Sequence, residues 1–340
     1  MKHSKRVTVG IPVYNVEKYI VRCLESVINQ DYVNIDILIM YDKSSDQSLE
    51  IARKILSSSK IKHDVLLNKL EKSSIGIARN LMLKNFEGDY LIFLDSDDFL
   101  EPGCISHLVS LSQKYDADIV KSSHRSLDEN NVVLKEELYP KEEVFDNHEF
   151  KNKLYIKNYH HSFYSWNKLY KRSFLKDNEM QYKHDVVEDA FFTFNEVENA
   201  KKIVLTPNIT YNYLVRPNSL TNIEATFGKI SVFVDNKKFI DDLYKNNKNL
   251  YAYCCKIDIF IMTYIMVVRD AFASSLISKE NKLKLLHQAF ETPKLPFKIF
   301  FAATFYKNWK VALIVLVKCL PFSANLKMVN LYHKFKGNKV

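Results

Sequence analysis

The sequence predicts an α/β fold, built on a mainly parallel sheet with helices on both faces, followed by a helical C-terminal region. Over the first hundred residues, short apolar β-branched runs alternate with stretches of helical period. This alternation is typical of strand–helix–strand units with right-handed crossovers. Beyond Glu224 the chain has helical character almost to its end, interrupted only by prolines at positions 293, 296 and 321.

Four apolar runs are expected to form buried strands, because each is short and nearly continuously apolar. They are Val7–Val13, Ile35–Tyr41, Val65–Asn68 and Tyr90–Asp95. Between the first two, apolar residues recur every three or four positions and predict one helix face: Val16, Tyr19, Ile20, Cys23, Leu24, Val27 and Ile28. Ligands of such sheets bind beyond the carboxyl ends of the strands, so polar residues at those ends are candidates for a site.

From about residue 116 the pattern is less regular. Two short runs, Asp118–Lys121 and Ile203–Leu205, are expected to be strands, and Val187–Ala200 is expected to be a helix. The length of 340 residues and the hydrophobic content of 47% allow a sizeable core in one large domain or two intimate lobes.

Targeting and redox signals favour a cytoplasmic protein. The five cysteines are scattered and have no CxxC spacing that could hold zinc. The apolar stretch after the basic N-terminus is short and contains Pro12, so we expect no signal peptide. No uncharged apolar run approaches the roughly 18 residues that a membrane-spanning helix requires.

The net charge of +9 is concentrated in the C-terminal tail. From Lys294 onward there are nine lysines and no Asp or Glu. The lysines are interspersed with the apolar runs Phe297–Phe305 and Val311–Val317, a pattern typical of a basic helix in the headgroup layer of an anionic bilayer. The alternative is a solvated helix that packs on the rest of the protein. Nucleic acid is not an expected partner, because no recognised motif accompanies the charge.

Three carboxylates directly follow the fourth predicted strand, in the segment Asp95-Ser96-Asp97-Asp98. Like charges this close are unfavourable unless a cation or strong donors neutralise them. Carboxylate oxygens suit Mg²⁺ or Mn²⁺, which can also bind phosphate oxygens. The alternative is that these residues cap a helix that begins near Pro102.

Five motifs, in order and spacing, resemble family 2 of the inverting glycosyltransferases, which have the Rossmann-like GT-A fold. They lie at residues 7–15, 42–48, 76–80, 88–98 and 187–189. The resemblance implies a nucleotide-sugar donor and a divalent metal, Mn²⁺ or Mg²⁺. It also implies a catalytic domain at about residues 1–222, with a nucleotide-binding part to about 115 and an acceptor-side part at about 116–222, and a helical region at 223–340.

The resemblance assigns a set of residues to the donor and its metal. Asp95 and Asp97 form the family's DxD motif, with Asp97 the better candidate for direct metal ligation. The other expected donor contacts are Pro12, Tyr14, Asn15, Asp42, Arg79, Ser96 and Arg216. An aromatic ring can stack on a base and a carboxylate can accept the uracil imide N–H, which favours UDP. Packing of Tyr14 and solvation of Arg79 are the alternatives.

One residue departs from the family pattern. Where the family usually has Gly after the second-strand aspartate, this chain has Lys43. Glycine at such a position often permits a positive φ, so Lys43 raises the question of how the loop after Asp42 is built.

On the acceptor side, the resemblance makes Asp189 the general base of a single-displacement reaction that inverts the anomeric carbon. Helix capping is the alternative for Glu188 and Asp189. Trp166, Asn167 and Lys168 lie in a stretch common in the family and are expected, with Glu188, to contact the sugar or acceptor. Core packing is an equal alternative for Trp166.

We therefore expect a metal-assisted glycosyltransferase that adds a hexose or N-acetylhexosamine to a bacterial surface glycan or lipid-linked oligosaccharide. It would act at the inner face of the cell membrane, attached peripherally by its tail. Two other classes stay open. A noncatalytic adaptor that binds membranes or polyanions would explain the tail but not the carboxylates. A sugar nucleotidyltransferase would normally carry a Gly-rich phosphate loop, which the segment Val7–Glu17 lacks.

Overall fold

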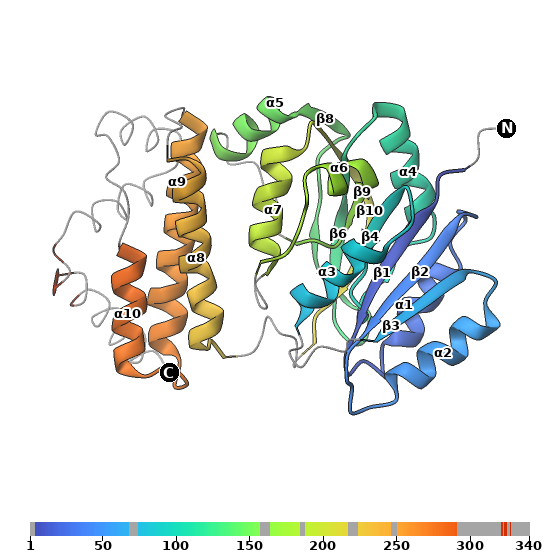
Figure 1. Cartoon of the computed structure of the whole chain (residues 1–340), viewed down its shortest axis with the longest axis horizontal. Coiled ribbons are helices and arrows are strands. Elements are labelled where there is room, and N and C mark those ends of the chain that lie inside the picture. The colour runs from blue at the N-terminus through green and yellow to red at the C-terminus, as the bar shows by residue number, and fades with distance from the viewer. Residues whose placement is uncertain are drawn as a thin grey trace. The chain divides into compact units, whose positions relative to one another are not determined.

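The computed structural model describes residues 4–67, 74–156, 164–183, 188–216, 224–245 and 250–290, together with positions 321, 323, 324 and 327 (Figure 1). The chain forms two compact units. One comprises residues 1–150 and 163–219, and the other comprises residues 151–162 and 220–340. The second unit thus includes a short stretch near residue 156 that the sequence had placed in the catalytic domain.

The first unit is built on a ten-stranded mixed sheet. Strand order is β3-β2-β1-β4-β9-β6-β10-β5, with β7 paired to β6 and β8 paired to β10. The strands are β1 (Val7–Val13), β2 (Ile35–Tyr41), β3 (Lys62–Leu67), β4 (Tyr90–Phe93), β5 (Phe99–Leu100), β6 (Ile119–Leu127), β7 (Val133–Glu137), β8 (Glu143–Asp146), β9 (Lys168–Lys171) and β10 (Lys202–Leu214). β1, β2, β3 and β4 run parallel, as do β6 and β10.

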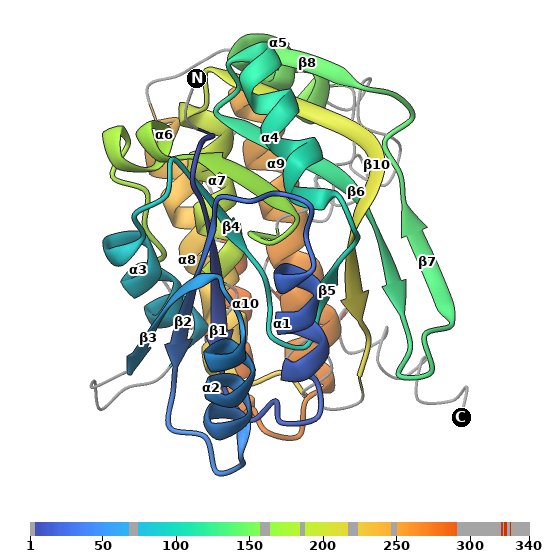
Figure 2. The same cartoon turned by 90° about the vertical axis from the view of Figure 1, so that its right-hand side faces the viewer.

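Helices cover both faces of this sheet (Figure 2). α1 (Ile20–Ile28), α2 (Ser48–Ser58) and α4 (Cys104–Tyr115) share one core with alternate residues of β1, such as Val9 and Ile11. α3 (Ile75–Asn85) lies against the opposite face, where a Cβ on Gly10 would stand 3.0 Å from the sulfur of Met82. Glycine at this position therefore lets α3 approach β1 closely. The remaining helices of this unit are α5 (Asn147–Lys151), α6 (Arg172–Asp177) and α7 (Glu188–Asn199).

The predicted fold class is confirmed, and the two N-terminal strands have the predicted bounds. The fourth strand ends at Phe93 rather than Asp95, because the chain turns at Ser96 and Asp97. β10 is far longer than the run Ile203–Leu205, since it continues to Leu214 through mixed residues that include the buried polar Thr206, Thr210 and Asn212. The last residue predicted for the third strand, Asn68, lies outside the described residues.

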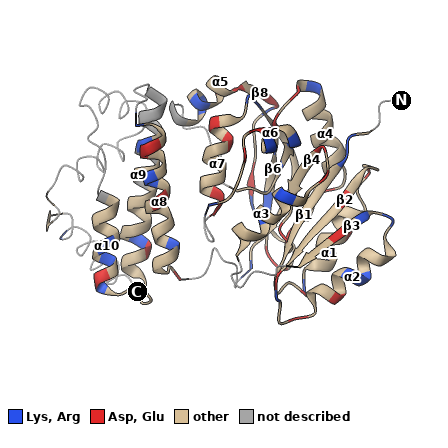
Figure 3. Cartoon of the chain, in the orientation of Figure 1, with Lys and Arg blue, Asp and Glu red and all other residues tan. Residues whose placement is uncertain are grey.

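The second unit is helical in its described part. It contains η1 (Asn152–Ile156), α8 (Phe227–Leu243), α9 (Leu250–Ile265), η2 (Met266–Ala271) and α10 (Lys279–Phe290). Ile230, Val267 and Leu285 belong to its core, while α10 carries charges of both signs, of which Lys279, Glu280 and Lys284 are exposed (Figure 3). Within the described residues, no helix has the length and apolar character needed to cross a bilayer. The two apolar runs predicted for the lysine-rich tail lie outside them.

Candidate active site

The carboxyl ends of β1, β2 and β4 bring three of the predicted residues to one edge of the sheet. Asp42 follows β2 directly, and its backbone N–H donates to the carbonyl of Val13, the last residue of β1, at 3.0 Å. Leu94 likewise donates to the carbonyl of Gly10 at 3.0 Å, which places Asp95 just beyond β4. Because the three strands are parallel, Tyr14, Asp42 and Asp95 share the edge at which such sheets bind ligands.

The loops after β1 and β2 are tied together by Asn15. Its side-chain oxygen accepts from the backbone N–H of Ser45 at 2.8 Å, and its own N–H donates to Ser44 Oγ at 3.0 Å. Asn15 has a left-handed φ of 51°, which Asn tolerates better than most residues. Asn15 thus connects the loop after β1 to the loop after β2. The neighbouring Tyr14 side chain is 58% exposed, whereas Pro12 is buried in β1.

Lys43 does not distort the loop after β2. It is absent from the positive-φ residues of the described chain, and its N–H donates to Asp42 Oδ1 at 2.9 Å. The conformation at this position therefore does not require glycine, and the departure from the family pattern is structurally harmless.

The three carboxylates after β4 have different partners. Asp95 accepts from Arg79 Nη2 at 2.8 Å, and Asp97 accepts from Arg216 Nε at 2.6 Å. Asp98 is fully buried and accepts from Tyr211 Oη and from the N–H of Leu214, both at 2.7 Å. Burial, followed by the charges of Asp97 and Asp95, raises the pKa of Asp98 well above its usual range.

These contacts exclude the alternative that Asp95, Asp97 or Asp98 caps the following helix. Helix α4 starts after Gly103, which is its N-cap residue, so none of the three carboxylates caps it. Asp98 instead fixes the turn to β10, and Ser96 beside it is also buried, with 6% of its surface exposed. Asp95 and Asp97 keep side-chain exposures of 23% and 17%. These two are the carboxylates of the turn that a ligand can reach.

Arg79 of α3 holds carboxyl groups from two distant parts of the chain. Its Nη1 donates to Glu188 Oε1 at 2.6 Å and to Asp189 Oδ1 at 2.7 Å, while Nη2 donates to Asp95. Its side chain is only 2% exposed. The sequence had placed Arg79 at the base or diphosphate, but its described contacts are with protein carboxyl groups.

Glu188 is the most deeply buried acid of this group, with a side-chain exposure of 7%. Burial and the neighbouring Asp189 raise its pKa from 4.5 to about 8, despite the opposing attraction of Arg79. A carboxyl group with this pKa is mainly protonated at neutral pH. Glu188 therefore adds little negative charge to the cluster and is not accessible as an acceptor contact.

Asp189, at the start of α7, is the more accessible of the two acids, with a side-chain exposure of 22%. Besides Arg79, its Oδ1 accepts from the backbone N–H of Ser165 at 3.2 Å and from Ser165 Oγ. In the described chain, all three of these donors reach the same oxygen. Asp189 thus lies in the same cluster as Asp95, joined to it through Arg79.

The segment around Trp166 differs from its expected role. Trp166 is 4% exposed and stacks between Tyr164, at 4.4 Å between ring centroids, and Tyr211, at 4.7 Å. The alternative of core packing therefore holds for Trp166. The exposed aromatic ring of this stack is Tyr164, at 38%, which the sequence reasoning missed because nothing in the residue pattern distinguishes the two rings.

Asn167 and Lys168 are also buried, at 3% and 0% exposure. Asn167 Nδ2 donates to the carbonyl of Ser122 at 2.6 Å, and Lys168 Nζ forms an ion pair with Glu196 at 2.6 Å. Their polar groups are therefore bound within the protein. The structure does not bring either side chain to a surface where it could contact a sugar or a phosphate, so we leave both out of the site.

The donor set for a divalent cation consists of two carboxylates. Among the described residues, no three His, Cys, Asp or Glu side chains form a ready-made metal cluster. Mg²⁺ commonly takes only one or two protein carboxylates and completes its shell with water and substrate phosphate oxygens. Asp95 and Asp97 fit that kind of site, because both are partly exposed. Burial, and then the charge of Asp97, raises the pKa of Asp95, although Arg79 opposes this shift.

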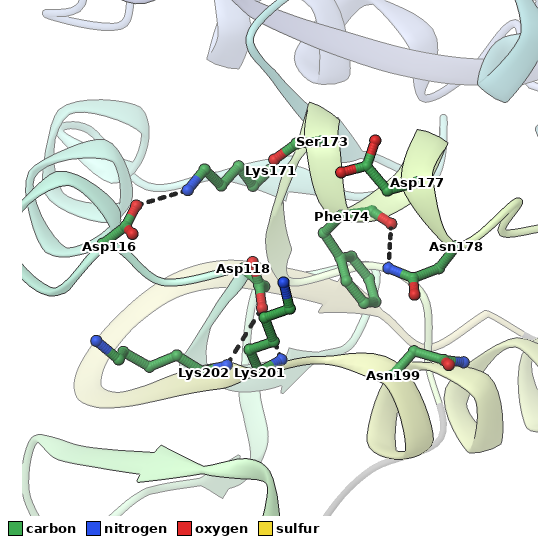
Figure 4. Close-up of a pocket in the computed structure, with 10 residues that line it drawn as sticks. All are labelled: Asp116, Asp118, Lys171, Ser173, Phe174, Asp177, Asn178, Asn199, Lys201 and Lys202. Carbon is green, nitrogen blue, oxygen red and sulfur yellow. Dashed lines mark hydrogen bonds and ion pairs between the residues drawn. The ribbon is translucent and has the colours of Figure 1, made fainter.

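A cavity of about 320 Å³ lies at the opposite edge of the sheet (Figure 4). Its lining includes Lys171, which pairs with Tyr90 at the start of β4, and Lys202 at the start of β10. Lys171 and Asp116 form an ion pair across it at 2.5 Å. None of the predicted site residues lines this cavity, so it is separate from the cluster around Arg79.

Comparison with known proteins gives consistent matches. A family model described as "Glycosyl transferase family 2" matches residues 8–178. Glycosyltransferase GlyA of Streptococcus pneumoniae serotype 4 is 32% identical over 229 residues, 64% of this chain and 32% of GlyA. Poly(ribitol-phosphate) beta-N-acetylglucosaminyltransferase TarS of Staphylococcus aureus is 26% identical over 217 residues, 62% of this chain and 35% of TarS. The match thus spans about a third of each relative.

Two solved structures share the fold. The crystal structure of TarS residues 1–349 with UDP-GlcNAc has a TM-score of 0.68 at 19% identity and covers 87% of this chain and 83% of that one. Mannosyltransferase PcManGT from Pyrobaculum calidifontis, in complex with GDP-Man and Mn²⁺, has a TM-score of 0.51 at 15% identity, with coverages of 98% and 89%. At these identities the likeness establishes the architecture alone, and it agrees with the predicted GT-A fold.

Proposed function

The chain belongs to glycosyl transferase family 2, and from that premise we propose that it transfers a sugar from a nucleotide-sugar donor to a hydroxyl group of a bacterial surface glycan. The observation that carries the proposal is the cluster at the carboxyl edge of the sheet. There Arg79 joins Asp95, on the donor side, to Asp189, on the acceptor side, through contacts of 2.8 and 2.7 Å. A single-displacement transferase needs these two functions side by side.

On the donor side, the exposed ring of Tyr14 is suited to stack on a base, with Asp42 close behind it. We propose UDP as the nucleotide, because a carboxylate at Asp42 can accept the uracil imide N–H. The UDP-GlcNAc complex of TarS supports this choice. Arg216 lies against Asp97 and is positioned to bind a diphosphate oxygen when a donor enters.

Asp97 and Asp95 are the residues that would hold Mn²⁺ or Mg²⁺, whose charge stabilises the departing diphosphate. On the acceptor side, Asp189 takes the proton of the attacking hydroxyl group. The acceptor oxygen forms a bond to the anomeric carbon as the bond from that carbon to the diphosphate oxygen breaks. Attack opposite the leaving group inverts the anomeric configuration.

The acceptor class rests on the relatives. TarS is named as acting on poly(ribitol-phosphate), which makes a surface polymer or its lipid-linked precursor the proposed acceptor. Next to Asp189, the exposed Tyr164 ring takes the stacking role first expected of Trp166. We also propose that the lysine-rich tail attaches the enzyme peripherally to an anionic membrane surface, each surface lysine contributing about 1 kcal/mol.

Donor hydrolysis tests the proposed function without knowledge of the acceptor. Full-length protein with Mn²⁺ is incubated with radiolabelled UDP-glucose, UDP-galactose, UDP-GlcNAc, UDP-GalNAc and GDP-mannose, and release of free sugar is measured. We expect slow hydrolysis of at least one UDP-sugar, abolished by EDTA. Hydrolysis of GDP-mannose alone would contradict the proposal that the donor nucleotide is UDP. Failure to bind or hydrolyse any of the five donors would contradict the proposed transferase function.

The membrane proposal has a separate test. Replacing Lys298, Lys307, Lys310 and Lys318 with Gln leaves the apolar residues of the tail unchanged. We expect this variant to lose co-sedimentation with vesicles of phosphatidylglycerol, while the parent binds less at high salt because exposed charges are screened. Equal co-sedimentation of the two proteins at low salt would contradict an electrostatic attachment.

A further inference from the structure

We propose that Ser165 is a positioning residue for Asp189, which selects the carboxylate oxygen that takes the acceptor proton. The inference rests on the proposed function, because it concerns the base of that reaction. It also gives a role to the stretch from Ser165 to Tyr170, whose side chains do not reach the substrate side of the cluster.

The donors to Asp189 are distributed unevenly over its two oxygens. Arg79 Nη1, the Ser165 N–H and Ser165 Oγ all donate to Oδ1. No hydrogen bond of the described chain reaches Oδ2. An oxygen that already accepts three hydrogen bonds has no lone pair well placed for a further proton. Oδ2 is therefore the proton acceptor, and the Oδ1 donors set the direction in which it points.

Ser165 is itself held rigidly. It is fully buried, and its carbonyl accepts from Tyr170 Oη at 3.1 Å. Tyr170 Oη also contacts Glu196 Oε1 at 2.5 Å, and Glu196 in turn forms the ion pair with Lys168. The buried Lys168 and Glu196 therefore anchor the loop that carries Ser165. Their cost of burial is offset by mutual pairing, and their effect is to fix the base.

Arg79 alone cannot fix this orientation. The same Nη1 that reaches Asp189 also donates to Glu188, and Nη2 donates to Asp95, so the guanidinium position is a compromise among three carboxyl groups. Ser165 contacts only Asp189 of these three. Its two donors therefore define the rotation of the Asp189 carboxylate separately from the donor-side residues.

A double-mutant cycle tests the proposal with donor hydrolysis, in which water replaces the acceptor. The four proteins are the parent, Ser165→Ala, Asp189→Asn and the double variant, assayed with UDP-glucose and UDP-GlcNAc. We expect Ser165→Ala to lower kcat about tenfold, because an oriented hydrogen bond to a charged group is lost, with the donor KM unchanged. In the Asp189→Asn background the same change should have little further effect, within about twofold.

Two further variants separate positioning from general structure. Ser112→Ala is the matched control, because Ser112 is also a buried serine with one hydrogen bond, to the carbonyl of Ala117, remote from the cluster. We expect it to leave kcat unchanged. Ser165→Thr keeps the hydroxyl group and should recover most of the kcat lost in Ser165→Ala. UDP affinity and the melting temperature establish that each variant is folded.

The outcomes are distinguishable. If Ser165→Ala lowers kcat equally in the parental and Asp189→Asn backgrounds, or raises the donor KM instead, Ser165 does not act through the base and the proposal is overturned. A parental kcat for Ser165→Ala overturns it too. If Asp189→Asn itself hydrolyses donor at the parental rate, the assignment of the base in the proposed function is what fails.

Discussion

The two edges of the sheet in the first unit both carry charged residues, but these groups are largely buried at the carboxyl edge and mostly exposed at the amino edge. At the carboxyl edge, Arg79 is 2% exposed and Glu188 7%, and their contacts join segments more than one hundred residues apart in the sequence. At the amino edge, most ion pairs are open to water, and the exception is the buried Asp36 beside Arg6. Asp116, which pairs with Lys171, is 83% exposed, and Glu87 and Asp89 there are 58% and 43% exposed.

The difference bears on which edge is the better candidate for a functional site. Exposed ion pairs contribute little to stability and need no special explanation. Burying an ionisable group is costly unless it is paired, so a cluster of carboxyl groups around the buried guanidinium of Arg79 is a candidate for a functional site. The cavity of about 320 Å³ lies at the amino edge, whereas the candidate catalytic residues lie at the carboxyl edge.

The largest expected difference between the edges is in stability. Arg79→Met leaves buried carboxyl groups without their shared partner, and should lower the free energy of unfolding by about 3–5 kcal/mol. Arg172→Met is the matched control at the amino edge, where the exposed guanidinium donates to the carbonyl of Glu87 at 2.7 Å, and should cost less than about 1 kcal/mol. Urea unfolding measures both, and similar losses would remove the distinction.

The next effect is on catalysis. Asp189→Asn keeps the shape of the side chain but cannot take a proton, so turnover should fall by about 10²-fold with donor affinity nearly unchanged. Asp116→Asn, the same substitution at the amino edge, should leave turnover at the parental level. A parallel loss of donor affinity in Asp189→Asn would assign this residue to the nucleotide pocket instead.

A smaller effect concerns pH. Glu188 has a pKa of about 8 in the folded protein and an ordinary value of 4.5, so between these values the folded state holds a proton that the unfolded state has released. Stability from this group is complete below about pH 4.5 and declines as pH rises toward 8, by up to about 1.4 kcal/mol per pH unit. Glu188→Gln should flatten this decline. An unchanged slope in urea unfolding from pH 5 to 8 would show that Glu188 is ionised throughout.

The smallest expected effect is at the exposed pair of the amino edge. Asp116→Asn removes the partner of Lys171, and should change the free energy of unfolding by less than about 0.5 kcal/mol, since water and salt replace an exposed partner easily. A loss of stability as large as that of Arg79→Met would mean that the residues lining the cavity beside Lys171 contribute to the stability of the sheet.

Much of the carboxyl edge could be predicted from local sequence. The strands Val7–Val13 and Ile35–Tyr41 are apolar and short, and the polar residues that follow them necessarily meet at one edge. The hydrogen bond from Arg79 to Asp189 could not be predicted, because the two residues lie 110 positions apart and only tertiary packing brings them together. For the same reason the sequence predicts a ligand contact for Lys168, whereas the structure pairs it with the buried Glu196.

Strands β7 and β10 were harder to predict for a different reason. In β7 every residue but Glu137 is exposed, so the apolar pattern that signals a buried strand is missing. After Leu205, β10 contains the buried polar residues Thr206, Thr210 and Asn212. Thr206 bonds to His107 of α4, and Asn212 donates to Glu101. Hydrophobic periodicity carries no information about such strands.

Donor binding at the carboxyl edge is tested most directly by calorimetric titration of UDP into the full-length protein, in Mn²⁺ and in EDTA. We expect the parent to bind UDP much more tightly in Mn²⁺. Asp97→Asn should lose most of that difference, and Asp116→Asn should keep it. Equal metal-dependent affinity in Asp97→Asn and the parent would contradict the claim that the carboxyl edge binds the donor through this aspartate.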